Sequence, residues 1–231
     1  IPWDDDLDVG MMRDEYEKAK KAFAGDKDFE LREIVCVSSG TLNLCYQLHY
    51  KAFDVEVRLD IFLYDYAVEM NEAVIQKQVE LNIEIAREGR NIAKALGLDP
   101  SHKDILFEYD SAPAEFVRCF ETFNRRAFEC YGRSKVNALG MIWSVDNFIY
   151  RPAVKTNKNL NEVFPLCEVE LEGHMFFSPR NALKYVNDIY GDAFSVPDDM
   201  NAHRHFRTNE RQRKNLDEIL VKYKFILEEE E

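Results

Sequence analysis

The chain begins with an acidic stretch inside an apolar frame, IPWDDDLDVGM. Four carboxylates occupy five consecutive positions there: Asp4, Asp5, Asp6 and Asp8. Each carboxylate raises the free-energy cost of ionising its neighbours, so the cluster needs a cation, a helix N-terminus or full solvation. The apolar residues around it argue against a solvated tail and favour a short buried strand over residues 7–12. The stretch therefore predicts a strand that holds a cation.

The period of a strand decides which of these acids act together. Side chains alternate between the two faces, so Asp6 and Asp8 point the same way and Asp4 extends that face. Leu7 and Val9 are expected to face the core. Carboxylate oxygens suit Mg²⁺ or Mn²⁺, which also bind phosphate oxygens.

A third carboxylate from a neighbouring strand would complete an oxygen cage, and Asp60 is the best candidate. It lies in the strand-like run VEVRLDIFLYDY, where an unpaired charge among apolar residues is costly. The alternative for Asp60 is an ion pair with Arg58 or another basic residue, and the pattern leaves both interpretations open.

Composition excludes several other classes of protein. A net charge of −13 argues against nucleic acid as a partner, because no basic surplus exists to neutralise phosphates. The five cysteines contain no CxxC pair, which argues against a zinc knuckle or a disulfide framework and fits a reducing compartment. No run of about twenty apolar residues predicts a transmembrane segment.

The pattern along the chain predicts one α+β domain over residues 1–231. Because position 1 is Ile and already lies at the edge of an expected strand, we expect a fragment of a longer chain. A two-armed strand motif is expected to turn at Glu172 and Gly173. Helices are predicted over residues 13–25, 67–96, 114–131, 179–192 and 208–231, and strands over 7–12, 33–39, 42–50, 55–66 and 137–152.

Four other motifs give weaker predictions of function. Asp4, Asp6, Asp8 and Glu15 match the acidic positions of a calcium loop, but Val9 stands where that loop requires glycine. Nothing in the spacing of Cys36, Cys45 or His49 singles out a catalytic nucleophile. His203 and His205 are candidates for binding a metal or a phosphate, although lone surface histidines are commoner. The segment SSGTLN is interpreted as a turn.

Three stretches resemble the LicD/fukutin family of phosphotransferases. IPWDDDLDVGMMRDEYEK resembles the family signature, in which an apolar-Pro-Trp opening leads into an acidic strand and a charged helix. LDIFLYDY, which holds Asp60 and Asp65, is similar to the second acidic strand. VFPLCEVELEGHMFFSPRNALKYVNDIYGDAFSVP resembles the closing block, with Pro179, Gly191 and Pro197. Residues 68–160 show no match.

The resemblance implies a nucleotidyltransferase-like fold, a mixed β-sheet flanked by helices. It implies that the protein moves a phospho-alcohol, such as phosphocholine or ribitol phosphate, from a CDP-linked donor to a glycan or glycolipid. Asp6 and Asp8 match the metal-binding acids of the family and Asp60 matches the third, so all three are expected to bind Mg²⁺ or Mn²⁺ and to serve catalysis. The family's Gly-rich stretch for the donor phosphates precedes the point where this sequence starts. Bacterial relatives imply the cytoplasm, at the inner membrane face, and fukutin-like relatives the Golgi lumen.

Two rival functions remain open on the residues alone. One is a glycosyltransferase that uses its own DxD motif on a nucleotide sugar. The other is a non-catalytic module that binds a cation without turning over any nucleotide donor.

Overall fold

The computed structural model describes residues 7–38, 42–51, 58–67, 72–101, 103–131, 138–140, 158–192, 194–195 and 214. The strands are β1 (Asp8–Met12), β2 (Phe29–Val37), β3 (Leu42–Tyr50), β4 (Arg58–Ala67), β5 (Ile105–Glu108), β6 (Ala138–Gly140), β7 (Lys158–Asn159), β8 (Cys167–Leu171) and β9 (His174–Ser178). The helices are α1 (Arg13–Phe23), α2 (Glu72–Ala95), α3 (Ala114–Tyr131), α4 (Leu160–Val163) and α5 (Ala182–Tyr190), with a 3₁₀ turn, η1, over Tyr109–Ser111.

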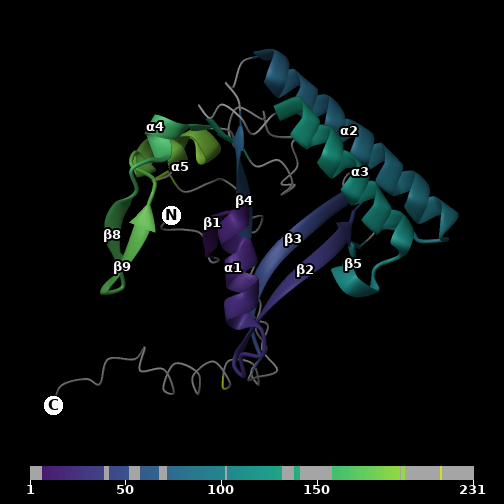
Figure 1. Ribbon diagram of the computed structural model, residues 1–231, viewed down its shortest axis with the longest axis horizontal. Helices are drawn as coiled ribbons and strands as arrows, with labels where there is room; N and C mark the ends of the chain where they lie inside the picture. The colour runs from purple at the N-terminus through teal and green to yellow at the C-terminus, as the bar shows by residue number, and fades with distance from the viewer. Residues whose placement is uncertain are drawn as a thin grey trace.

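A mixed β-sheet forms the centre of the fold, which confirms the predicted α+β class. Strands β1 to β5 lie in the order β5-β2-β3-β4-β1, and β4 also pairs with β6, which pairs with β7. Of the pairings between described strands, β1 with β4 is parallel and the others are antiparallel. Figure 1 shows α1 in front of β1 and β4, with α2 and α3 side by side beyond the far ends of β2 and β3.

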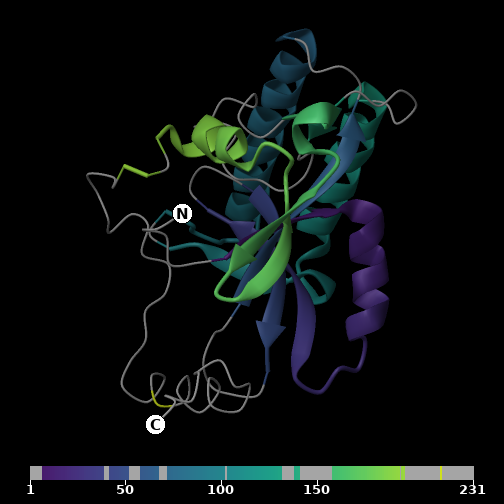
Figure 2. The same ribbon diagram turned by 90° about the vertical axis from the view of Figure 1, so that its left-hand side faces the viewer.

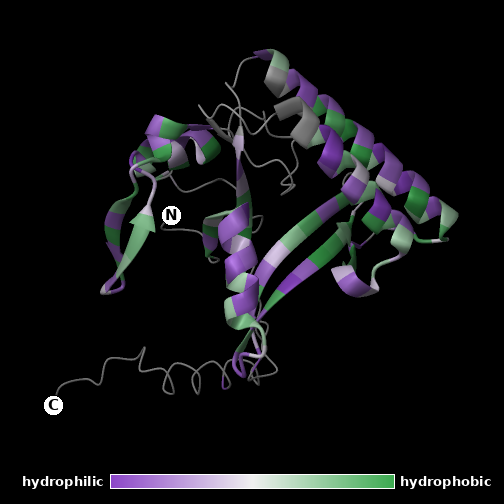
Figure 3. Cartoon of the chain, viewed as in Figure 1, coloured by the Kyte–Doolittle hydropathy of each residue, from purple (hydrophilic) through white to green (hydrophobic). Residues whose placement is uncertain are grey.

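One face of the sheet carries the apolar residues on which α1, α2 and α3 pack. Val35 and Leu42 lie on this face and are fully buried against α2 and α3. Further along the same face, Tyr46 and Ile61 pack against Tyr16 of α1. Figure 3 shows hydrophobic and hydrophilic residues alternating around α2 and α3, the pattern expected of helices with one buried stripe. We call this surface the helix-covered face.

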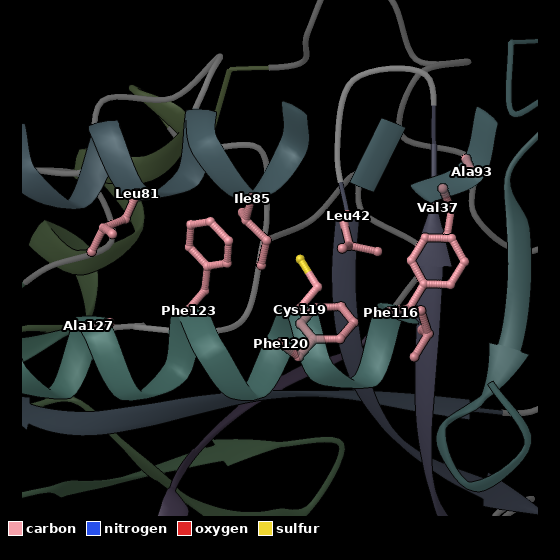
Figure 4. Close-up of a cluster of buried hydrophobic side chains, with 11 residues drawn as sticks. Val37, Leu42, Leu81, Ile85, Ala93, Phe116, Cys119, Phe120, Phe123 and Ala127 are labelled. Carbon is pink, nitrogen blue, oxygen red and sulfur yellow. The ribbon is translucent and has the colours of Figure 1, made fainter. Parts of the chain in front are cut away.

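The main core lies between α2, α3 and this face. In Figure 4, Phe116 and Phe123 of α3 point toward Val37 and Ile85, which belong to β2 and α2. A buried phenylalanine contributes about 2–3 kcal/mol to the free energy of unfolding, so these rings are a main source of stability.

Among the described helices, none has the length and apolar character needed to cross a membrane.

The other face of the sheet carries Asp8, Gln47 and Asp60, and we call it the site face. Helices α4 and α5 pack near it through a cluster that contains Tyr64, Val163 and Tyr185. The hairpin β8-β9 extends from these helices, and Figure 2 shows it in front of the sheet. Its turn has positive φ at Glu172 and Gly173, the two residues at which the sequence predicts the bend.

Two expectations about local structure are wrong. Leu7 does not face the core, because its side chain is 50% exposed at the residue before β1 begins. The second helix does not begin at Ala67, since this residue ends β4 by pairing with β6 and α2 begins only at Glu72. The predicted helix over residues 208–231 lies outside the described residues, apart from Lys214.

Candidate functional site

Asp8 and Asp60 are paired across two neighbouring parallel strands. The register of β1 on β4 sets Asp8 directly beside Asp60, and the Asp60 N–H donates to the Leu7 carbonyl at 3.3 Å. Paired residues of adjacent strands point to the same face at a strand spacing of about 4.8 Å. The fold thus holds two carboxylates close together on the site face. Like charges side by side on adjacent strands are unfavourable unless a cation lies between them.

Asp6 lies outside the described residues, as do Asp4 and Asp5. Within the described ranges, no group of three His, Cys, Asp or Glu side chains is arranged to hold a metal. Two carboxylates still suit Mg²⁺, because this ion is commonly held by one or two carboxylates together with substrate phosphates. The donor set on the site face therefore fits a magnesium-type ion.

Asp60 contacts both a neutral and a charged neighbour. Gln47 Nε2 donates to its Oδ1 at 2.6 Å, and Arg58 Nε lies 3.8 Å from its Oδ2. The ion pair that the sequence offered as an alternative role for Asp60 is thus present, at the outer limit of such contacts. Because the Arg58 and Asp60 side chains are 36% and 28% exposed, solvent weakens this pair.

Two tyrosine hydroxyls lie in the electrostatic field of Asp8. Tyr64 of β4 and Tyr185 of α5 hydrogen-bond to each other through their hydroxyl groups. Burial and the negative charge of Asp8 raise the pKa of both phenols, so both are protonated at neutral pH. Gly10 makes room for the Tyr64 ring, since a Cβ at Gly10 would lie 3.0 Å from Tyr64 Cε2.

A buried lysine supports the helix that carries Tyr185. Lys158 is 3% exposed, and its Nζ donates to Asp188 Oδ2 at 2.9 Å. The same ammonium group lies 5.0 Å from the centre of the Tyr185 ring, within the range of a cation–π contact. These contacts hold α5 against β7.

The opposite side of β4 carries a second acid, Asp65, in a different role. Arg13, the first residue of α1, donates from Nε to both Asp65 oxygens at 3.0 Å and from Nη2 to Oδ2 at 2.7 Å. Burial alone would lower the pKa of Arg13, but the hydrogen bonds and charge of Asp65 outweigh it, and the pKa is raised. Asp65 is therefore fully engaged in a structural ion pair.

A pocket of about 360 Å³ opens beside this ion pair, at the carboxyl ends of β1 and β4. Its lining consists of Met12, Arg13, Asp14, Glu17, Tyr64, Asp65 and Tyr66. Three carboxylates against one guanidinium make this pocket unfavourable for phosphate groups.

The other motifs of the sequence do not form a site in the described residues. The described part of the candidate calcium loop does not form a loop. Asp8–Met12 is a strand and Glu15 lies in α1. Burial raises the pKa of Cys36 to about 11, so its thiol is protonated and weakly nucleophilic. His203 and His205 lie outside the described residues.

Sequence reasoning missed Gln47, Tyr64 and Tyr185 as neighbours of the acids. A signal for Gln47 exists, because Gln47 and His49 put two polar side chains on one face of an otherwise apolar strand. Tyr185 is separated from Tyr64 by 121 positions, and no local pattern links them.

A scan against protein-family models finds no matching family, and searches of curated proteins and of solved structures find no match.

Proposed function

We propose that the protein is a metal-dependent phosphotransferase that moves a phospho-alcohol from a CDP-linked donor to a glycan. The observation that carries this proposal is the side-by-side placement of Asp8 and Asp60 on adjacent parallel strands. The resemblance of three stretches to the LicD/fukutin family and its nucleotidyltransferase-like fold supports it.

Asp8 and Asp60 would hold the ion, with Asp6 as the third ligand expected from the strand period. When bound, a divalent ion supplies positive charge for the pyrophosphate of the donor and for the leaving nucleotide. Asp60 has a second possible role, because a carboxylate in this position can accept the proton of the acceptor hydroxyl. Tyr64 and Tyr185 keep their protons and offer hydroxyl groups beside Asp8.

The donor identifies the reaction. Release of CMP from CDP-choline, CDP-ribitol or CDP-glycerol should require Mg²⁺ or Mn²⁺ and stop with EDTA. Turnover of a nucleotide sugar in place of these donors would favour the DxD glycosyltransferase. Metal binding with no turnover of either class would favour the non-catalytic module.

The Asp8→Asn variant separates a metal ligand from a structural acid. Without metal, the change relieves repulsion with Asp60, so the free energy of unfolding should hold or rise by up to about 1 kcal/mol. CMP release should nevertheless be lost, because the ion loses a ligand. Melting temperature and CMP release are measured on the same preparation. Asp104→Asn, at an exposed position before β5, is the matched control and should change neither. A destabilised Asp8→Asn variant with normal turnover per folded molecule would contradict the proposal.

A further inference from the structure

Two buried polar side chains of β3 form a hydrogen-bonded chain that ends on Asp60. Gln47 and His49 are 8% and 7% exposed, and both lie on the site face. His49 Nε2 is 2.8 Å from Gln47 Oε1, and Gln47 Nε2 is 2.6 Å from Asp60 Oδ1. Burying an amide and an imidazole is unfavourable unless both are hydrogen-bonded, so each link of this chain matters for the others.

The chemistry of Asp60 sets the direction of the whole chain. An ionised carboxylate only accepts hydrogen bonds, so the Gln47 amide must present its NH₂ group to Asp60. The Gln47 carbonyl then faces His49, which must donate from Nε2. His49 thereby prevents a flip of the Gln47 side-chain amide, and Gln47 in turn holds one oxygen of Asp60.

The charge of the side chain that donates a hydrogen bond to Asp60 is as important as its position. An amide satisfies the carboxylate without neutralising it, whereas lysine or arginine at position 47 would add a second cation beside Arg58 and compete with a metal ion. The register places Gln47, Asp60 and Asp8 in one row across β3, β4 and β1. With Oδ1 held by Gln47 and Oδ2 lying 3.8 Å from Arg58 Nε, the Asp60 carboxylate is fixed in orientation in the row that contains Asp8.

We propose that Gln47, fixed by His49, is a positioning residue that orients Asp60 for a divalent cation shared with Asp8. This inference rests on the proposed function, since it assumes that Asp8 and Asp60 bind the ion. Residues that hydrogen-bond to metal ligands commonly change metal affinity by about 10- to 100-fold when they are replaced.

The test measures the affinity of the full chain for Mn²⁺, from the free-ion EPR signal, well below the melting temperature. Gln47→Leu removes the donor to Asp60 and should weaken Mn²⁺ binding by about 10- to 100-fold. His49→Phe keeps an aromatic ring but lets the Gln47 amide turn, and should weaken binding by at least threefold. Gln76→Leu, on the exposed side of α2, is the matched control and should bind Mn²⁺ like the wild type.

The readout separates positioning from a merely structural role. A structural role predicts a lower melting temperature for Gln47→Leu and an unchanged Mn²⁺ affinity in the folded protein, and this result would overturn the inference. If Gln47→Leu does not fold, wild-type affinity in His49→Phe would overturn it equally. Loss of Mn²⁺ binding in Asp8→Asn together with normal binding in both β3 variants would leave the proposed function standing and reject the inference. A wild-type chain that does not bind millimolar Mn²⁺ would reject both.

Discussion

Asp60 and Asp65 belong to the same strand but point to opposite faces of the sheet, because an odd number of positions separates them. Asp60 lies beside another acid, a neutral amide and, at 3.8 Å, the partly exposed Arg58, whereas Asp65 accepts hydrogen bonds from both Nε and Nη2 of the Arg13 guanidinium. A carboxylate that keeps its charge available suits a cation, and one that is fully paired suits the core. Residue type alone does not distinguish these roles, but strand parity does.

The Arg13–Asp65 pair gives a stability prediction at this scale. The two side chains are 20% and 8% exposed, so replacing one partner leaves a largely buried charge unpaired. We expect Arg13→Met to lower the free energy of unfolding by about 3 kcal/mol, and the double variant Arg13→Met/Asp65→Leu to recover most of that loss. Urea denaturation measures both.

The exposed pair of Lys18 and Glu15 provides the control for this experiment, with side chains that are 68% and 54% exposed. Lys18→Met should leave the free energy of unfolding unchanged within the error of the measurement, because solvent screens an exposed pair. Additive losses in the double variant, with no recovery, would show that Arg13 and Asp65 do not act as a pair.

At the scale of helices and strands, the local sequence pattern predicts those elements whose ends are defined by residues within or next to the element itself. The predicted bounds of β3 and α3 coincide with Leu42–Tyr50 and Ala114–Tyr131, since alternation marks the first and Pro113 precedes the second. The predicted helix start at Ala67 is wrong because this residue ends β4, where it pairs with β6. Pairing partners distant in sequence are invisible to a local pattern.

The same limit applies to the candidate site. The strand period identified Asp8 and Asp60 as candidates, but their lateral register comes from the parallel docking of β1 on β4. The electrostatic effect of Asp8 on Tyr185 depends on the packing of α5, which is far from β1 in the sequence. Such packing is decided by the shape of the assembled core, which single residues do not encode.

Gly89 gives a prediction for the contact between α2 and the sheet. In an isolated helix, Gly89→Ala would add about 1 kcal/mol of stability. A Cβ at Gly89, however, would lie 2.6 Å from the Leu42 Cβ, and overpacking of this kind costs about 1–3 kcal/mol. We therefore expect Gly89→Ala to be destabilising, by about 1 kcal/mol, in urea denaturation.

Asn91→Ala, on the exposed side of the same helix, should instead stabilise the protein by up to about 0.7 kcal/mol. In a Leu42→Gly background the penalty of Gly89→Ala should disappear, because the Leu42 Cβ that the new methyl group meets is removed. A stabilising effect of Gly89→Ala in the wild-type background would contradict the close approach of α2 to β3.

At the scale of the whole molecule, buried tyrosines make stability sensitive to alkaline pH. Burial raises the pKa of Tyr16, Tyr46 and Tyr64, in the case of Tyr46 to about 12 although Arg13 opposes the shift. Below pH 10 these phenols are protonated in both the folded and the unfolded chain. Above pH 10 only the unfolded chain ionises, so the free energy of unfolding falls as the pH rises toward the folded pKa values.

For Tyr46 alone, the expected loss by pH 12 is about 2–3 kcal/mol. Urea denaturation between pH 8 and pH 11.5 measures this decline. Tyr46→Phe should be less stable at pH 8 but lose stability less steeply above pH 10. Equal slopes in the two proteins would show that Tyr46 is not held protonated by the fold.

The parallel pairing of β1 with β4 also has a consequence for how the chain assembles. Arg13 and Asp65 are 52 positions apart, and Asp8 and Asp60 are equally far apart. Strands β3 and β4 are consecutive in the sequence and pair with each other. Among the described strands, β1 pairs with β4 alone, and this pairing closes a long loop of the chain. Its arrival also brings two like charges together. A chain with β1 undocked has no carboxylate pair, so the divalent ion proposed above would bind the sheet with β1 docked in preference to its precursors and would stabilise that docking.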